Sequence, residues 1–127
     1  MHTINLDGRY LVAVNNSANG EVNAHTLFQY RQVDDLVWAT YKGGRILFGQ
    51  LIARLDEQGE LNARYQHVNV EGEIMTGICN SVPELLPDGR VRLHEYWRWT
   101  CGDNASGTSI TEEIRNIPSG QFMPELP

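Results

Sequence analysis

The chain has 127 residues and a mass of 14.4 kDa, the length of one ordinary domain. Its 41% hydrophobic and 20% charged residues can form a buried core, which excludes the disordered, collagenous and coiled-coil classes. The formal net charge of −6 argues against nucleic acid and anionic membranes as partners, because both are bound by clustered lysine and arginine.

The first ten residues include Asp7, Gly8 and Arg9 and lack the apolar stretch of a signal peptide. Nor is any apolar run long enough to span a bilayer as a helix. We therefore expect a cytoplasmic protein with no membrane partner.

Short apolar runs, separated by turn signals about every ten residues, predict eight strands. They cover residues 9–15, 24–32, 36–41, 45–55, 60–69, 73–81, 90–100 and 106–115. Short connections favour antiparallel neighbours, and eight strands in a meander can close around side chains or one small ligand. The predicted fold is all-β, an eight-stranded antiparallel up-and-down barrel. A sandwich with both faces buried is the alternative.

We expect one domain over residues 1–116. Residues 117–127 contain three prolines and one glycine, which argues against a ninth strand. We expect this tail to wrap over the surface or to reach a neighbouring subunit.

The Gly43-Gly44 turn sets the predicted register of the strands after it. A two-residue turn there places Trp38 opposite Gly49, and the later turns place Tyr65 between Gly49 and Gly77. Such alternation of large and small residues is typical of a barrel interior. The predicted interior face consists of Leu36, Trp38, Leu47, Gly49, Leu51, Ala63, Tyr65, His67, Met75, Gly77 and Cys79.

The opposite face of these strands is too apolar for a surface that only contacts water. Its residues are Val37, Ala39, Tyr41, Ile46, Phe48 and Ile52. We expect it to be the interface of a homo-oligomer, a dimer or larger.

The strand over residues 90–100 carries the strongest candidate site. Alternation turns its apolar residues inward, namely Val91, Leu93, Trp97 and Trp99, and carries Glu95 with them. A hairpin centred near Asp103 would set Glu95 opposite Glu112 or Glu113. Burial and mutual repulsion would then raise the pKa of at least one carboxyl group.

A carboxyl group in an aromatic pocket suits acid–base catalysis, and it equally suits binding of a urea, an amide or an amine. A structural ion pair is the third interpretation, with Arg31 or Arg64 as the partner of Glu95.

His67 shares the predicted face of Tyr65 and is the other polar candidate. It could take part in a proton relay or, with further ligands, in a metal site. No paired-histidine spacing supports a metal, so we expect neither a metal nor a cofactor. Cys79 and Cys101 lack the spacing of a zinc site and are expected to be free buried thiols.

Several motifs carry a resemblance that spans the chain from Gly8 to Ile114. They are Gly8-x-Tyr10, Trp38-Ala39-x-Tyr41-x-Gly43-Gly44, Tyr65-x-His67-x-Asn69, Met75-Thr76-Gly77-x-Cys79 and Glu95-x-Trp97-x-Trp99-x-x-Gly102-Asp103. Together they resemble a family of small uncharacterised bacterial proteins, some of which carry the label N-acetylglutamate synthase. The architecture is similar to the avidin and lipocalin-like, or calycin-like, barrels, whose inward tryptophans line a pocket for one small molecule. That resemblance implies Trp38, Tyr65, Trp97 and Trp99 as pocket lining.

Three functions remain open. The leading one is binding of a small, partly apolar organic molecule, with Glu95 and His67 orienting its polar end. The second is an isomerase, cyclase or hydrolase that moves a proton with Glu95 and either His67 or Glu113. The third is an interaction protein whose interior is filled by its own side chains. The candidate site residues are Trp38, Tyr65, His67, Glu95, Trp97, Trp99 and Glu113.

Overall fold

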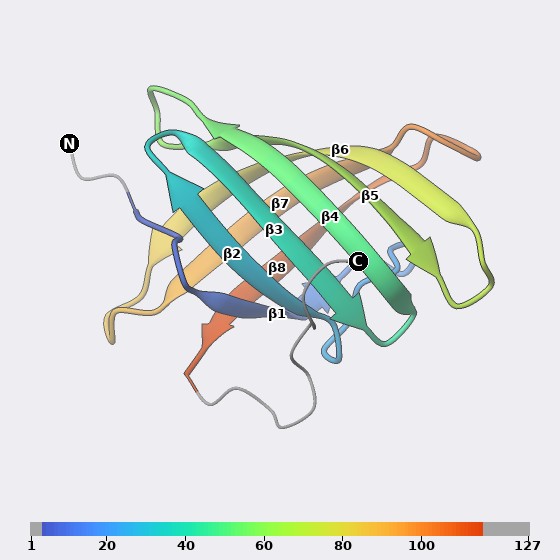
Figure 1. Ribbon diagram of the computed structural model, residues 1–127, viewed down its shortest axis with the longest axis horizontal. Coiled ribbons are helices and arrows are strands. Elements are labelled where there is room, and N and C mark those ends of the chain that lie inside the picture. Colours follow the sequence, from blue (N-terminus) through green and yellow to red (C-terminus); the bar gives the residue numbers. More distant parts are fainter. Residues whose placement is uncertain (1–3, 116–127) are drawn as a thin grey trace.

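Eight antiparallel strands follow one another in chain order and close into a barrel where the last strand pairs with the first (Figure 1). The computed structural model describes residues 4–115. The strands are β1 (Tyr10–Asn16), β2 (Leu27–Val33), β3 (Leu36–Gly43), β4 (Ile46–Leu55), β5 (Leu61–Asn69), β6 (Ile74–Leu85), β7 (Val91–Trp99) and β8 (Ser106–Ile114). The predicted meander barrel is confirmed, and the sandwich is not formed. The tail predicted over residues 117–127 lies outside the described residues.

One end of the barrel is filled by apolar side chains. Residues 4–9 run past the end of β2, where the Gly8 N–H donates to the Tyr30 carbonyl oxygen over 2.9 Å. Leu6 from this segment is only 1% exposed, and it packs with Leu11 and Leu61 in the core. The polar interior residues therefore lie toward the other end, which the loop between β1 and β2 covers. Among the described residues there is no helix that is long and apolar enough to cross a membrane.

The predicted face of β3 was wrong. Trp38 pairs with Ile52, whereas Tyr41 pairs with Gly49, so the pairing is displaced by three positions along β4. The turn comes one residue later than predicted, because Gly43 already pairs with Ile46, and a bulge lies between Tyr41 and Gly43. An odd displacement exchanges the two faces of a strand. The buried residues of β3 are Val37, Ala39 and Tyr41, and Leu36 and Trp38 face outward.

The next two hairpins keep the predicted faces. Gly49 pairs with His67 instead of Tyr65, an even displacement that leaves both histidine and tyrosine inside the barrel. Tyr65 pairs with Gly77, as predicted. A bulge near the start of β4 turns Leu47 outward, where it is 56% exposed, so its predicted inward position was wrong.

Glycines make room for aromatic rings of neighbouring strands inside the barrel. A Cβ atom on Gly49 would collide with the ring of Tyr41, and one on Gly77 would collide with the ring of Tyr65. Gly107 gives the same space to Trp97, its partner on β7. The predicted alternation of large and small residues is therefore present, with Tyr41 in the place that was assigned to Trp38.

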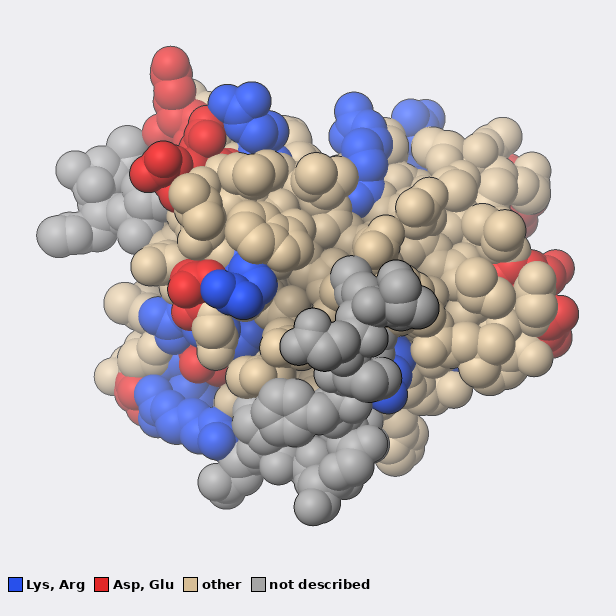
Figure 2. All heavy atoms as spheres, viewed as in Figure 1, with Lys and Arg blue, Asp and Glu red and all other residues tan. Residues whose placement is uncertain are grey.

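The outer face of β3, β4 and β5 carries a shallow groove. Its lining includes Leu36, Trp38, Ile52 and Arg64, and Ile52 is 58% exposed. Figure 2 views the molecule from the side of β3 and β4, where uncharged residues lie among charged side chains of both signs. The apolar wall predicted for this side was partly wrong, because Val37, Ala39, Tyr41 and Ile46 belong to the core.

Candidate functional site

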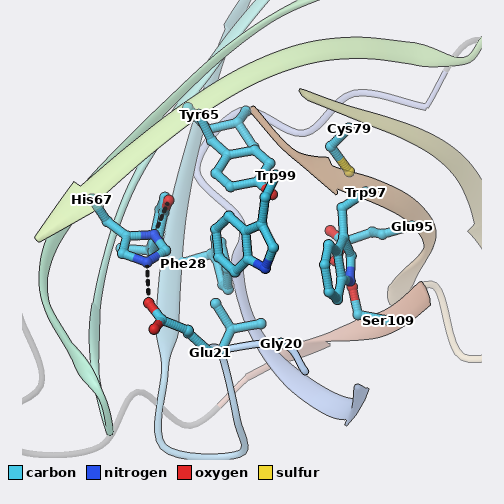
Figure 3. Close-up of a pocket in the computed structure, with 13 residues that line it drawn as sticks. Gly20, Glu21, Phe28, Tyr65, His67, Cys79, Glu95, Trp97, Trp99 and Ser109 are labelled. Carbon is cyan, nitrogen blue, oxygen red and sulfur yellow. Dashed lines mark hydrogen bonds and ion pairs between the residues drawn. The ribbon is translucent and has the colours of Figure 1, made fainter. Parts of the chain in front are cut away.

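A cavity of about 50 Å³ lies inside the barrel, beneath the loop between β1 and β2 (Figure 3). It is several times larger than the roughly 10–15 Å³ that one water molecule needs. It is much smaller than the roughly 300–1,000 Å³ pockets that hold drug-sized ligands. The lining residues are Gly20, Glu21, Val22, Phe28, Tyr41, Leu51, Tyr65, His67, Cys79, Glu95, Trp97, Trp99 and Ser109.

Aromatic rings form most of the wall. Trp97 and Trp99 point inward from β7, with ring centroids 5.4 Å apart. The ring of Trp99 also lies edge-on to Tyr65 at 5.8 Å and to His67 at 5.8 Å. These four residues were predicted to be inward, and they are brought together. Trp38 was predicted beside them, but among residues 4–115 it lines the outer groove and not the cavity.

Glu95 is the deepest charged group of the site. It is 7% exposed, and it accepts hydrogen bonds from the hydroxyls of Ser109, over 2.7 Å, and Thr111, over 3.3 Å. Burial raises the pKa of the Glu95 carboxyl to about 7, and the two hydroxyl hydrogen bonds oppose that rise. A carboxyl group with this pKa exchanges a proton readily near neutral pH.

The partner predicted for Glu95 was wrong. Its partner on β8 is Ser109, because the hairpin turns about two residues earlier than a pairing with Glu112 or Glu113 requires. Glu112 pairs with Arg92 on the outer face, with 2.7 Å between the guanidinium and the carboxylate. Within residues 4–115 the side-chain partners of Glu95 are the two hydroxyls and no arginine, so the third interpretation, a structural ion pair with Arg31 or Arg64, is wrong.

Glu113 lies away from the cavity. Its carboxylate contacts the Arg9 guanidinium at 2.6 Å and accepts the backbone N–H of Val91 over 3.0 Å. Because Val91 begins β7 at the filled end of the barrel, Glu113 is an ion-pairing residue there. Glu113 was wrongly predicted as a site residue because the predicted register of β8 placed it opposite Glu95.

His67 is the centre of a hydrogen-bonded chain at the mouth of the cavity. Its Nε2 lies 2.7 Å from a carboxylate oxygen of Glu21, and its Nδ1 lies 2.9 Å from the hydroxyl of Tyr41. A carboxylate can only accept, so Nε2 carries the hydrogen, and the Tyr41 hydroxyl donates to Nδ1. Burial lowers the pKa of His67, although the Glu21 hydrogen bond opposes this, so the neutral imidazole is favoured.

The loop between β1 and β2 lines one side of the cavity with Gly20, Glu21 and Val22. The second oxygen of Glu21 accepts the side-chain amide N–H of Asn69 over 3.0 Å. Asn16 fixes the start of the loop, since its amide donates to the Val22 carbonyl and accepts the indole N–H of Trp97. In Figure 3 Glu21 and Gly20 lie below the tryptophans, across the cavity from Tyr65. The loop is therefore attached to the wall that it covers.

Sequence reasoning missed several lining residues. Ser109 could have been found, because alternation along β8 places it on one face with Gly107 and Thr111. Tyr41 was missed because the inward face of β3 was predicted wrongly. Glu21 left no signal, because alternation does not fix the direction of a loop side chain.

Both cysteines are free thiols, as expected, but only Cys79 is buried, so the predicted burial of Cys101 was wrong. Cys79 lines the cavity, and burial raises the pKa of its thiol to about 12. Since the thiolate is the reactive form, Cys79 is unsuited to act as a nucleophile at neutral pH. Cys101 is partly exposed and lies near Met75.

The arrangement can accept N–H donors and surround an apolar or flat group. Two carboxyl groups, Glu21 and Glu95, line the cavity, and no lysine or arginine of the described chain does so. A neutral histidine and a tyrosine hydroxyl complete the polar part. This composition favours a neutral or positively charged guest over an anion.

The family model described as Avidin-like protein matches residues 4–114 of the chain, a range that includes all eight strands. No curated protein and no solved structure gives a significant match. The match supports the barrel resemblance noted in the sequence and gives no support to the N-acetylglutamate synthase label.

Proposed function

The chain belongs to the avidin-like protein family, and from this premise we propose that it binds a small organic molecule inside the barrel. The observation that carries the proposal is Glu95, a carboxyl group buried beside a cavity with aromatic walls. Burying such a group costs stability, and this cost is easiest to understand where the group serves a ligand. The polar end of the ligand would meet Glu95 and His67, and its apolar part would contact Tyr65, Trp97 and Trp99.

The size of the cavity limits the ligand as long as the loop keeps its position. A volume of about 50 Å³ accommodates only a few non-hydrogen atoms. A larger ligand requires movement of the loop that carries Glu21, which breaks the hydrogen bonds to His67 and Asn69. The N-acetylglutamate synthase label plays no part in the proposal, because Glu21 and Glu95 would repel the carboxylates of glutamate.

The proposal is tested by tryptophan emission and thermal unfolding across a metabolite library. A ligand at a hundred times its Kd should stabilise the protein by about 2.7 kcal/mol and raise Tm by about 10 °C. The substitution Cys79→Leu narrows the cavity and should weaken that response. Tyr96→Thr, on the outer face of β7, should leave it unchanged. Equal responses in both variants would show that the ligand binds elsewhere.

A second candidate function is proton transfer in the same cavity. It is favoured by the alignment of Tyr41, His67 and Glu21, since a carboxylate that orients an imidazole is a common part of acid–base sites. Once a ligand is known, Glu95→Gln separates the two functions. If the wild type converts the ligand and Glu95→Gln binds it without converting it, the protein is an enzyme. If the wild type itself leaves the ligand unchanged, it is a binding protein.

We also propose that the protein works in the cytoplasm as a homo-oligomer. Two free thiols are typical of a reducing compartment. The exposed apolar residues Leu36 and Ile52, beside Trp38 in the outer groove, favour contact with another copy. Sedimentation of the wild type and of Ile52→Lys tests this, because the charged variant should sediment as a smaller species.

A further inference from the structure

We infer that the cavity selects a small organic cation with N–H donors, such as a protonated amine, amidine or guanidine. The inference rests on the proposed function and adds the charge and the chemical class of the ligand. It depends on the charges of the lining, the aromatic faces, the acceptors that remain open and the size of the cavity.

The charges of the lining all have one sign. Glu21 and Glu95 are its carboxyl groups, and the nearest guanidinium, that of Arg45, lies 3.9 Å from Glu21. The side chain of Arg45 is 44% exposed and also contacts Glu71, so it faces the rim and not the cavity. A bound cation would therefore meet opposite charge from two sides, and a bound anion would meet none.

The aromatic wall favours the same class of ligand. The faces of Trp97, Trp99 and Tyr65 carry partial negative charge, and cations are attracted to such faces most strongly where water is excluded. Trp97 and Trp99 are both more than nine-tenths buried. A neutral apolar guest would use the same rings, but it would leave the buried Glu95 carboxylate without a charged partner.

Glu95 retains acceptor capacity toward the cavity. A carboxylate can accept about four hydrogen bonds. In the described part of the chain its oxygens accept one each, from Ser109 and Thr111, and both donors lie on β8. The hydroxyl of Tyr41 gives its hydrogen to His67 and keeps lone pairs for a further donor. N–H groups of a ligand suit both acceptors.

The affinity for a cation should depend on the protonation of Glu95. A cation favours the ionised carboxyl, so binding should strengthen as pH rises through about 7 and should release a proton below that pH. Burial lowers the pKa of His67, which lines the same cavity and is favoured in its neutral form, so the ionisation of Glu95 is the main change of charge in this range. Burial raises the pKa of Tyr30 on β2, Tyr41 on β3, Tyr65 on β5 and Cys79 on β6, so all four stay neutral.

Guanidinium, urea and acetate provide matched probes. Each is planar, has four non-hydrogen atoms and fits the closed cavity, but their charges are +1, 0 and −1. The best ligands of this size reach a Kd on the order of tens of micromolar, so NMR titration at millimolar concentrations is suitable. The indole N–H signals of Trp97 and Trp99 report the cavity, and Trp38 on the outer face serves as an internal reference.

At pH 8 guanidinium should shift the Trp97 and Trp99 signals with a Kd at least tenfold below that of urea, and acetate should not saturate. Between pH 8 and pH 6 guanidinium should lose about tenfold in affinity, because the ionised fraction of Glu95 falls by about that factor. This second measurement needs no variant. In Glu95→Gln the preference for guanidinium over urea should disappear, while Tyr96→Thr should keep it.

The possible results separate the two proposals. If urea or acetate binds in the cavity more tightly than guanidinium, the cation inference is overturned and the proposed function stands. If none of the three probes shifts Trp97 or Trp99 up to 50 mM, or if Trp38 shifts equally, the cation inference is overturned, and the proposed function is then decided by the metabolite screen. A guanidinium preference that survives in Glu95→Gln would also overturn the inference, because the charge would then lie elsewhere.

Discussion

The buried carboxyl of Glu95 gives the sharpest prediction about stability. In the folded protein its pKa is about 7, and in the unfolded chain it returns to about 4.5. Below pH 4.5 both states carry the proton, and the folded state has no charge penalty. Between these two values only the folded state holds the proton, so stability falls as pH rises, and above about 7 the loss is complete. The loss amounts to about 3 kcal/mol.

Replacing Glu95 with glutamine removes the charge and keeps the shape. The amide oxygen that this substitution introduces can still accept from Ser109, and the hydroxyl of Thr111 can rotate to accept from the new amide nitrogen. The variant should match the wild type within about 1 kcal/mol near pH 4. From pH 4 to pH 8 the stability of the variant relative to the wild type should rise by about 3 kcal/mol, which corresponds to about 10 °C in Tm.

Differential scanning calorimetry from pH 4 to pH 8 measures this gap without chemical denaturants, two of which are candidate ligands. Glu84→Gln is the control, since His94 holds the pKa of this exposed carboxyl below its usual value. Because this pKa lies below 4.5, the stability difference between Glu84→Gln and the wild type should stay nearly constant over most of the scan, and any change at its acid end should have the opposite sign. If stability changes with pH in the same way in the wild type and in Glu95→Gln, Glu95 does not have a raised pKa in the folded protein.

Three further predictions concern packing, reactivity and the loop. Gly77→Ala should destabilise the barrel by about 1–3 kcal/mol, because the new methyl group collides with the ring of Tyr65, and an unchanged Tm would contradict this contact. At pH 8 an alkylating reagent should modify Cys101 in the folded protein, while Cys79, whose thiol pKa burial raises to about 12, should react only after unfolding; equal rates would be inconsistent with the burial of Cys79. Glu21→Ala should speed hydrogen exchange in the loop between β1 and β2 by tenfold or more and leave β5 unchanged, and uniform protection would show that the loop is held by other contacts.

Strand positions and interior faces could be predicted where turns and alternation agree. All eight strands and the closure of the barrel follow from the spacing of apolar runs and turn glycines. Gly72, in the turn before β6, adopts a positive φ that glycine allows, and Tyr65 pairs with Gly77 as the spacing of the turns predicts. The inward set of β7, including Trp97 and Trp99, required only the alternation of a strand.

Register could not be predicted where bulges lie near the turn. Two bulges flank the hairpin between β3 and β4, one after Tyr41 and one after Ile46. Each inserts a residue that no composition rule detects. The bulge after Tyr41, in the pairing of β3 with β4, moved Trp38 to the outer face, and the bulge after Ile46, in the pairing of β4 with β5, turned Leu47 outward. The outer wall was mispredicted with it, because an error of odd size exchanges an entire face.

The chemistry of the site depends on the same kind of detail at one hairpin. With Glu95 opposite a second glutamate, two carboxyl groups would share a proton, which is an arrangement for acid–base catalysis. With Glu95 opposite Ser109, a single carboxyl group is held by two hydroxyls among aromatic rings, which is an arrangement for holding a donor-bearing guest. Two registers that differ by about three residues therefore predict two classes of protein from one strand. The alternation along β7 identifies the residue that matters, and only its cross-strand partner decides what that residue can do.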